Sequence, residues 1–236
     1  MTQQGIDVDA HKRVLTMLLL EISRSIGTKI AFKGGTASMI FYGLPRLSLD
    51  LDFDVLKEIT SKDEEVISLI LSQRGRILEQ ENKRHTLFFL FDYEKGRPNV
   101  KLEFNKRIWQ NNRYLIKQLM GVQINVQDEA TTLSNKMVAL IDRKNPVPRD
   151  LFDIHYFLTI YFRPNPDLIR ERTGVELNDF IQRLIEAIDV KFSGKSVLYG
   201  LGELINASQK EWAKRVLIPE TKRLLEEMKS KTDQTA

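Results

Sequence analysis

Residues 33–55 read KGGTASMIFYGLPRLSLDLDFDV, and the second half of this stretch decides the fold class. From position 47 onward, apolar and polar residues alternate strictly, which predicts a β-strand with one apolar and one polar face. The polar face would carry Ser48, Asp50, Asp52 and Asp54. Neighbouring carboxylates repel one another and are costly to bury unpaired, so this face needs a positive partner.

A pair of divalent metal ions is the partner that the spacing suggests. Successive residues on one face of a strand lie about 6.5–7 Å apart at Cα. Two carboxylates at that spacing can converge on a pair of ions. We therefore predict that Asp50 and Asp52 bind Mg²⁺ or Mn²⁺.

A third metal ligand is predicted from a second strand. In VKLEF (residues 100–104) the apolar residues share one face, which places Glu103 on the other. If the two strands are neighbours in the right register, Glu103 joins the two aspartates. A D-x-D motif does not by itself identify a reaction, because solvated strand faces and metal-dependent glycosyltransferases also carry it.

The residues before the strand predict a phosphate site. The motif K-G-G-T stands between an expected strand at residues 29–33 and a short helix expected at 36–42. Glycines let a phosphate approach the backbone closely, and a helix N-terminus favours an anion. Two further polar residues follow before the carboxylates. The predicted nucleotide-binding residues of this stretch are Lys33, Gly34, Gly35, Thr36, Arg46 and Ser48.

Composition excludes several classes of site. The chain of 236 residues has no cysteine, which rules out disulfides, thiol catalysis and cysteine-based zinc sites, and its three histidines are scattered. The apolar run VLTMLLLEI is too short to span a membrane, and the first residues lack the order of a signal peptide. We expect a cytoplasmic protein with no membrane partner. The net charge of +4 is compatible with a polyanionic partner without establishing one.

The strand signal stops near residue 128. Before that point, the pattern predicts further strands at residues 84–94, 99–107 and 122–127, with helices at 9–26 and from Ser61. After it, four segments have helical periodicity: residues 131–143, 149–162, 176–190 and 208–229. We predict an α/β (α+β) domain over residues 1–128 and a mainly helical domain over 129–236.

Three stretches together resemble one protein family. KGGTASMIFYGLPRLSLDLDF resembles the first motif of the AbiEii/AbiGii-type nucleotidyltransferase toxins, a branch of the polymerase-β-like superfamily, through G-G-T, Y-G and R-x-S-x-D-x-D-F. LSNKMVALIDR is similar to the family's lysine-bearing helix, with Lys136 in place. PRDLFDIHYF is similar to its R-D-x-x-D motif, through Arg149, Asp150 and Asp153. The three motifs occur in the family's order between residues 33 and 157.

The resemblance implies a fold and an activity. It implies a polymerase-β-like core with a mixed sheet, a helical C-terminal region, and transfer of a nucleoside monophosphate from an NTP. The acceptor would be RNA, with a tRNA 3′ end expected first, and a cognate antitoxin would restrain the toxin. Asp50, Asp52, Lys136 and Asp150 would be catalytic, with Lys136 and Asp153 also in the nucleotide site. Glu103 stands where the wider superfamily usually has aspartate.

Alternatives to this function stay open. The acceptor of the nucleotide is a protein or a small molecule such as an antibiotic in a second hypothesis, and the chain is a non-catalytic nucleotide- or RNA-binding module in a third. For an RNA acceptor, the basic and aromatic residues of 106–117 are a candidate approach path, because single strands bind cations and stack on aromatic rings. The same segment reads equally well as a solvated linker with Trp109 packed inward.

Overall fold

The structure is a computed structural model that describes residues 7–145, 147–194 and 196–233. The chain forms two compact units. Unit 1 consists of Met1–Gly43, Leu47–Ile108 and Tyr114–Gln127. Unit 2 consists of Leu44–Arg46, Trp109–Arg113 and Asp128–Ala236. Two short segments from within the first half of the chain therefore belong to the second unit.

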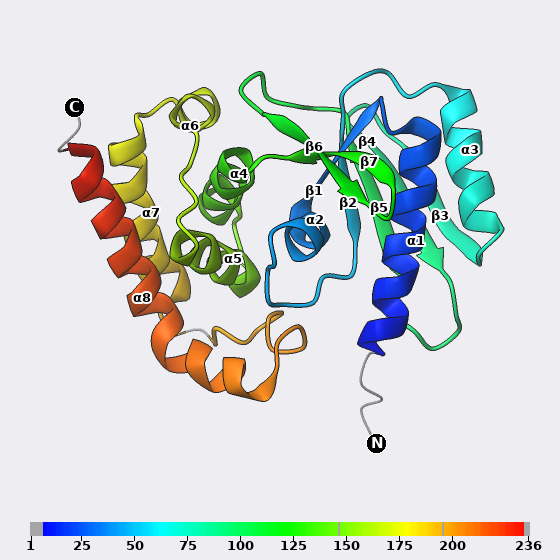
Figure 1. Cartoon of the computed structure of the whole chain (residues 1–236). Helices are drawn as coiled ribbons and strands as arrows, with labels where there is room; N and C mark the ends of the chain where they lie inside the picture. The colour runs from blue at the N-terminus through cyan, green and yellow to red at the C-terminus, as the bar shows by residue number, and fades with distance from the viewer. Residues whose placement is uncertain (1–6, 146, 195, 234–236) are drawn as a thin grey trace. The chain divides into compact units, whose positions relative to one another are not determined.

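Unit 1 is built on a mixed seven-stranded sheet with the strand order β3-β4-β5-β2-β1-β7-β6 (Figure 1). The strands are β1 (Ile30–Lys33), β2 (Leu51–Val55), β3 (Arg76–Asn82), β4 (Thr86–Asp92), β5 (Val100–Asn105), β6 (Tyr114–Leu119) and β7 (Val122–Gln127). Strand β2 is parallel to β5 and β1 is parallel to β7, whereas the remaining pairs are antiparallel. The helices of this unit are α1 (Val8–Ile26), α2 (Gly34–Phe41) and α3 (Ser61–Ser72).

The strict alternation of the strands produces one apolar face. Phe32, Phe53 and Phe104 lie side by side on β1, β2 and β5, with ring centroids 5.3 and 4.9 Å apart, and all three are fully buried. The apolar stripe of α1, which includes Leu15, Leu18 and Ile22, is also fully buried, and α1 packs on β7 and α3. Burying large apolar side chains removes their surface from water, which stabilises the unit. The polar residues of the same strands therefore lie on the opposite face.

The strand that carries the aspartates begins later than the sequence predicts. Strand β2 starts at Leu51, so Ser48 and Asp50 lie in the loop before it, and their placement on its polar face is wrong. In a strand, the backbone carbonyls of this segment would accept hydrogen bonds from a neighbouring strand. Here they accept hydrogen bonds from side chains instead. The Thr36 hydroxyl donates to the Asp50 carbonyl at 2.5 Å, and the ring of His11 donates to the Leu49 carbonyl at 3.2 Å.

Two strands that the sequence reading omitted complete the sheet. Strand β3 has no fully buried residue, so the hydrophobic alternation that marks a strand is weak in it. Strand β6 begins within the basic segment 106–117, extends to Leu119 and pairs with β7. Met120 and Gly121 join β6 to β7 with φ angles of 48° and 78°, the conformation of a tight hairpin turn.

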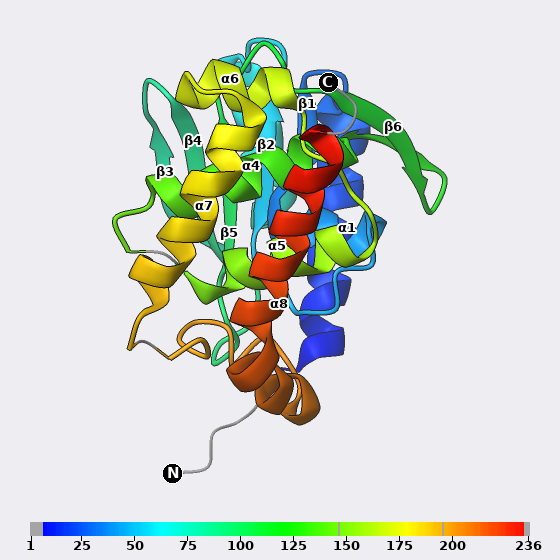
Figure 2. The ribbon, with the colours of Figure 1, turned by 90° about the vertical axis from the view of Figure 1, so that its left-hand side faces the viewer.

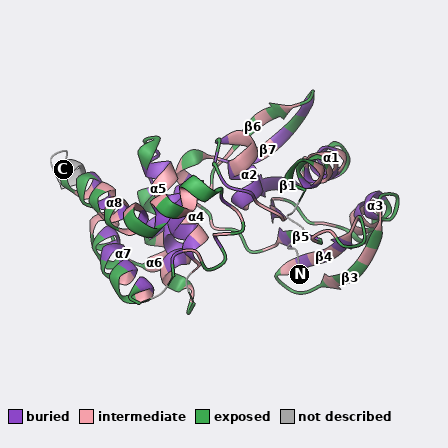
Figure 3. Ribbon diagram, turned by 90° about the horizontal axis from the view of Figure 1, so that it is seen from below, coloured by how far each residue is buried: buried purple, intermediate pink, exposed green. Residues whose placement is uncertain are grey.

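Unit 2 contains five helices within the described residues. They are α4 (Glu129–Asp142), α5 (Pro148–Thr159), α6 (Pro166–Thr173), α7 (Leu177–Phe192) and α8 (Ala207–Asp233). Helix α5 packs against α4 and α8, and α7 packs against α8, as Figure 2 shows for the long C-terminal helix. Each of α7 and α8 has buried residues along one side and exposed residues along the other (Figure 3). Among the helices that the structure describes, none is both long and apolar enough to cross a membrane.

Two aromatic residues of α5 belong to this core. Phe152 and Phe157 are buried, and the ring of Trp212 on α8 meets Phe152 edge-on at 6.1 Å between centroids. The ring of His155 lies 4.8 Å from the same tryptophan ring, and burial lowers the pKa of this histidine. These rings pack α5 against α8.

Candidate functional site

The polar face of the unit 1 sheet gathers charged residues from β1, β2 and β5. Asp52 on β2 pairs with Lys33 on one side and with Glu103 on the other. Neighbouring strands lie about 4.7–4.9 Å apart, and paired residues of a sheet project to the same face. Asp50 lies one residue before β2, and its Oδ1 accepts a hydrogen bond of 3.4 Å from the backbone N–H of Lys101 at the start of β5. The three predicted metal ligands therefore come from the neighbouring strands β2 and β5 and from the loop before β2.

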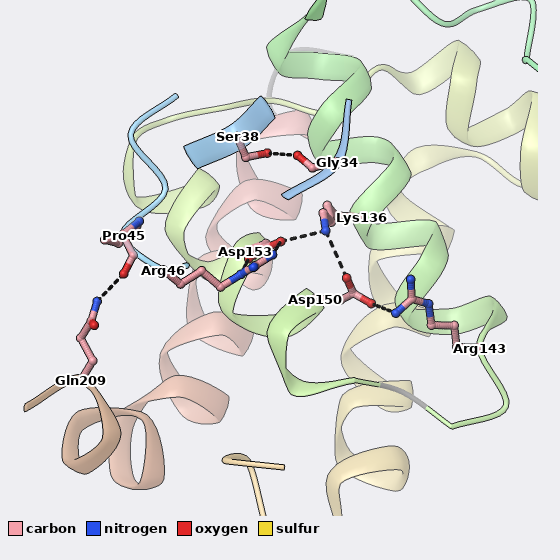
Figure 4. Close-up of polar contacts among 9 residues, drawn as sticks. All are labelled: Gly34, Ser38, Pro45, Arg46, Lys136, Arg143, Asp150, Asp153 and Gln209. Carbon is pink, nitrogen blue, oxygen red and sulfur yellow. Dashed lines mark hydrogen bonds and ion pairs between the residues drawn. The ribbon is translucent and has the colours of Figure 1, made fainter. Parts of the chain in front are cut away.

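The backbone at Gly34 lies directly against Asp52. Gly34 has a φ of +79°, and a Cβ added there would lie 2.3 Å from Oδ2 of Asp52. Any side chain at this position would both clash and be strained, which explains the glycine. Gly34 is the first residue of α2, and its carbonyl accepts a hydrogen bond of 2.9 Å from the Ser38 hydroxyl (Figure 4). The predicted glycine turn therefore touches one of the predicted metal ligands.

Thr36, a predicted nucleotide-binding residue, has a hydrogen bond within unit 1. Its hydroxyl is buried and donates to the carbonyl of Asp50. This hydrogen bond ties the first turn of α2 to the loop that carries Asp50. Within unit 1, Thr36 therefore positions a predicted catalytic carboxylate.

The second aspartate of β2 has a cation of its own. Asp54 is 1% exposed, and Lys33 Nζ lies 2.6 Å from its Oδ1. Its other oxygen accepts hydrogen bonds from Gln127 Nε2 at 2.7 Å and from the Tyr114 hydroxyl at 3.0 Å. A buried carboxylate is tolerated when it is paired and hydrogen-bonded in this way. The lysine predicted to bind nucleotide thus forms an ion pair with Asp54.

The donor chemistry of Asp50, Asp52 and Glu103 fits a hard divalent cation. Carboxylate oxygens are the ligands that Mg²⁺ prefers in proteins. Asp50, Asp52 and Glu103 would supply them, and β2 and β5 hold the last two in register. In the described part of the chain, no group of three or more acidic, histidine or cysteine side chains is already arranged as a metal site. Metal dependence is therefore part of the proposal below.

Unit 2 has its own cluster of charges, between α4, α5 and the segment 44–46 (Figure 4). Lys136 Nζ on α4 lies 2.8 Å from Oδ2 of Asp153 and 3.2 Å from Oδ1 of Asp150. The two aspartates are three residues apart on α5, and that spacing places them on one face of the helix. Arg143 Nη1 lies 2.7 Å from the other oxygen of Asp150. Lys136, Asp150 and Asp153, which sequence motifs brought together, are in direct contact.

Arg46 completes this cluster from a distant part of the sequence. Its Nε and Nη2 donate to the two oxygens of Asp153 at 2.5 and 2.6 Å. The segment that carries it is anchored in unit 2, because Leu44 is buried and the carbonyl of Pro45 accepts a hydrogen bond of 2.7 Å from Gln209 Nε2. Arg46 was predicted to bind nucleotide, and in the structure it binds a carboxylate.

Burial and charge act against each other at this pair. Burial raises the pKa of Asp153, but the positive charges of Arg46 and Lys136 outweigh it and leave the pKa below its ordinary value. Burial likewise lowers the pKa of Arg46, and the charge of Asp153 outweighs it, so the net shift is upward. Both shifts favour the charged forms. Asp153 and Arg46 are therefore a buried ion pair.

The comparison with known families identifies the chain. The model of the family described as "Nucleotidyl transferase AbiEii toxin, Type IV TA system" matches residues 18–227. The chain belongs to this family. The match spans both units and every residue of the two charge clusters described above. The resemblance inferred from three motifs is confirmed.

Solved structures show the same fold as this AbiEii-family chain. A crystal structure of a protein from H. pylori described as a nucleotidyltransferase has a TM-score of 0.64 and 19% identity, and the alignment covers 100% of this chain and 99% of that one. JHP933 from Helicobacter pylori has a TM-score of 0.62 and 20% identity, with 100% and 96% covered. None of the curated proteins compared with the chain matches it. The predicted fold class, an α/β nucleotidyltransferase core with a mixed sheet, is confirmed.

Membership in the AbiEii family supports a transferase. It implies an NTP as substrate and an antitoxin as partner. The family description names neither the acceptor of the nucleotide nor a metal.

Several contacts of the two clusters in this AbiEii-family chain involve residues outside the sequence motifs. Gln127 and Tyr114 bind Asp54, and Arg143 binds Asp150, yet none of the three lies in a recognised motif. Tyr114 does lie in the basic and aromatic segment 106–117, which the sequence indicated as a candidate approach path for RNA. Its hydroxyl is bound to Asp54, and the guanidinium of Arg172 lies 5.5 Å from the ring of Trp109. Both aromatic residues of the predicted RNA path therefore have structural contacts.

Proposed function

We propose that this protein is a metal-dependent nucleotidyltransferase toxin that moves a nucleoside monophosphate from an NTP to an RNA, with a tRNA 3′ end as the acceptor. The observation that supports it most strongly is the register of Asp52 with Glu103, beside the close approach of Gly34 to Asp52. Two carboxylates and a glycine turn are thus assembled on one sheet face. That arrangement suits an ion and a phosphate chain bound together.

The carboxylates serve the transfer step. The acceptor hydroxyl oxygen bonds to the α-phosphorus, the bond from that phosphorus to the bridging oxygen breaks, and pyrophosphate leaves. Asp50, Asp52 and Glu103 would hold Mg²⁺ or Mn²⁺, which when bound neutralises charge on the triphosphate. The proton of the acceptor hydroxyl passes to a carboxylate of this face and then to solvent. The turn at Gly34 and Gly35 offers backbone N–H groups to phosphate oxygens.

The cations and acids of unit 2 serve the same reaction in this proposal. Lys136 acts as a compact positive charge for the triphosphate, because an ammonium has three donors and its two aspartate contacts use two of them. Asp150 orients Lys136 and is the fourth catalytic residue. Phosphoryl-type transfer depends mainly on positioning and charge neutralisation, which these residues supply.

Labelled nucleotides test the reaction and its acceptor. Purified protein is incubated with each labelled NTP and Mg²⁺, together with total RNA, tRNA alone or cell protein. We expect label on tRNA, removed by a chelator. Label on protein or on a small molecule would overturn the RNA acceptor and keep the transferase. No label on any of these would contradict the transferase itself.

Two substitutions test the carboxylates. Asp52→Asn and Glu103→Gln should each lower transfer at least 100-fold, a typical cost for losing an electrostatic group at a transfer site. Both should leave the melting temperature unchanged or higher, because they remove repulsion between neighbouring acids. Glu79→Gln is the matched control, since it removes the same charge from an exposed position of β3 in the same sheet. Near-normal transfer by Asp52→Asn would contradict the proposed site.

A further inference from the structure

Arg46 is placed where it cannot act as a surface ligand. Its side chain is 3% exposed, and that of its partner Asp153 is 0% exposed. The two parallel hydrogen bonds engage both carboxylate oxygens in the bidentate geometry that only arginine provides. A phosphate would have to displace a fully buried carboxylate to reach this guanidinium along those donors. Nε and Nη2 of Arg46 are therefore already engaged by Asp153.

Asp153 connects Arg46 to Lys136. The same oxygen, Oδ2, lies 2.6 Å from Arg46 Nη2 and 2.8 Å from Lys136 Nζ. Lys136 is 16% exposed, so it is the member of this chain of contacts that water or a ligand can reach. A shift of Arg46 would move the carboxylate that fixes the ammonium group.

The charge balance of the cluster also depends on Arg46. Arg46 and Lys136 both lie against Asp153, and Lys136 and Arg143 both lie against Asp150. Without Arg46, the cation that remains against Asp153 in this network is Lys136. Charges in a low-dielectric interior interact strongly, so Lys136 would then be drawn fully into pairing with Asp153.

We propose that Arg46 is a positioning residue that holds and neutralises Asp153, and so leaves Lys136 fixed and positively charged for the triphosphate. This inference rests on the proposed function for the role of Lys136, but its geometric part concerns unit 2 alone. In this proposal, Arg46 of the first motif supports Lys136 of the lysine-bearing helix.

A double substitution separates positioning from direct binding. Arg46→Gln leaves Asp153 without its bidentate partner, and we expect the affinity for NTP, measured by calorimetry, to fall at least 10-fold. Adding Asp153→Asn removes the uncompensated carboxylate, and we expect the double variant to regain most of that loss. If Arg46 bound the nucleotide directly, Asp153→Asn would restore nothing, and that result would overturn the proposal.

Chemical labelling of Lys136 gives a readout that does not require activity. An amine-reactive reagent is applied briefly, and modification of Lys136 is measured by mass spectrometry. We expect slower modification in Arg46→Gln and recovery in the double variant, whereas an unchanged rate in Arg46→Gln would overturn the proposal. A wild type that binds and transfers no nucleotide would overturn the proposed function, and the labelling would still decide the role of Arg46.

Controls guard against simple misfolding. Arg215→Gln removes an arginine from an exposed position of α8 and should leave both NTP affinity and Lys136 labelling unchanged. If Arg46→Gln does not fold, as judged by circular dichroism, Arg46→Lys replaces it. Lysine keeps the charge but loses the bidentate fork, so we expect intermediate NTP affinity and labelling close to wild type. Wild-type affinity with altered labelling in Arg46→Lys would contradict the proposal.

Discussion

Asp54 in unit 1 and Asp153 in unit 2 are both buried carboxylates, but their partners differ. Asp54 has one lysine and two neutral donors, and the lysine itself is 21% exposed. Asp153 has an arginine and a lysine, and the arginine is 3% exposed. In the first arrangement the ion pair is with a lysine that water can reach. In the second, two cations lie against one carboxylate, and one of them, Lys136, is 16% exposed and also contacts Asp150.

The largest expected effect compares the loss of each carboxylate. Asp153→Ala leaves Arg46 buried without its counter-ion, and removing one partner of a buried pair costs about 3–5 kcal/mol. Asp54→Ala leaves Lys33, which can reach water, so we expect a cost of about 1–3 kcal/mol. Urea denaturation of both variants measures the difference. Equal losses would show that the two pairs are equivalent.

A glycine substitution tests the close approach in unit 1. Gly34→Ala combines a positive φ with a clash against Asp52, so we expect a loss of about 1–3 kcal/mol and a fall in NTP transfer as Asp52 moves. Gly121→Ala is the matched control, because its φ is +78° and no atom lies within 4 Å of the added Cβ. It should cost about 1 kcal/mol and leave transfer intact. Equal transfer by the two variants would contradict a functional contact at Gly34.

The smallest expected effect concerns a carboxylate near the surface of unit 1. Lys29 and the backbone and hydroxyl of Thr60 lower the pKa of Asp63 from 3.8 to about 2. A lowered pKa in the folded state stabilises the protein above pH 3.8, and this contribution is lost as pH falls toward 2. Asp63→Asn should cost about 1 kcal/mol at neutral pH, the usual value of a helix cap.

The pH dependence of protein stability tests the predicted contribution of Asp63. Stability curves of wild type and Asp63→Asn, measured between pH 7 and the acid transition, should converge as Asp63 becomes protonated. A constant difference at all pH values would mean that the aspartate acts by packing rather than by charge. In contrast to Asp153, this carboxylate is held by one cation at 2.6 Å and a helix cap, so its loss strands no buried charge.

Local patterns predicted much of the fold and of the site. Alternation placed Asp52 and Glu103 on polar strand faces, and the structure pairs them. The same alternation misled at Ser48 and Asp50, because side chains from α1 and α2 take the carbonyls of that segment. Strand β3 was missed since nothing in it is fully buried. The roles assigned to the site residues remain predictions.

The sequence by itself determined the fold class, the family and the residue types of the site, because these depend on periodicity and on motifs that are local in the chain. Tertiary structure decided which charges meet. Lys33 bonds Asp54 across two strands, and Arg46 reaches Asp153, 107 positions away in the chain. Such partners are fixed by strand register and by helix packing, which join residues that share no local pattern. The sequence therefore named the charged residues, and only the packing of each unit showed which of them neutralise one another.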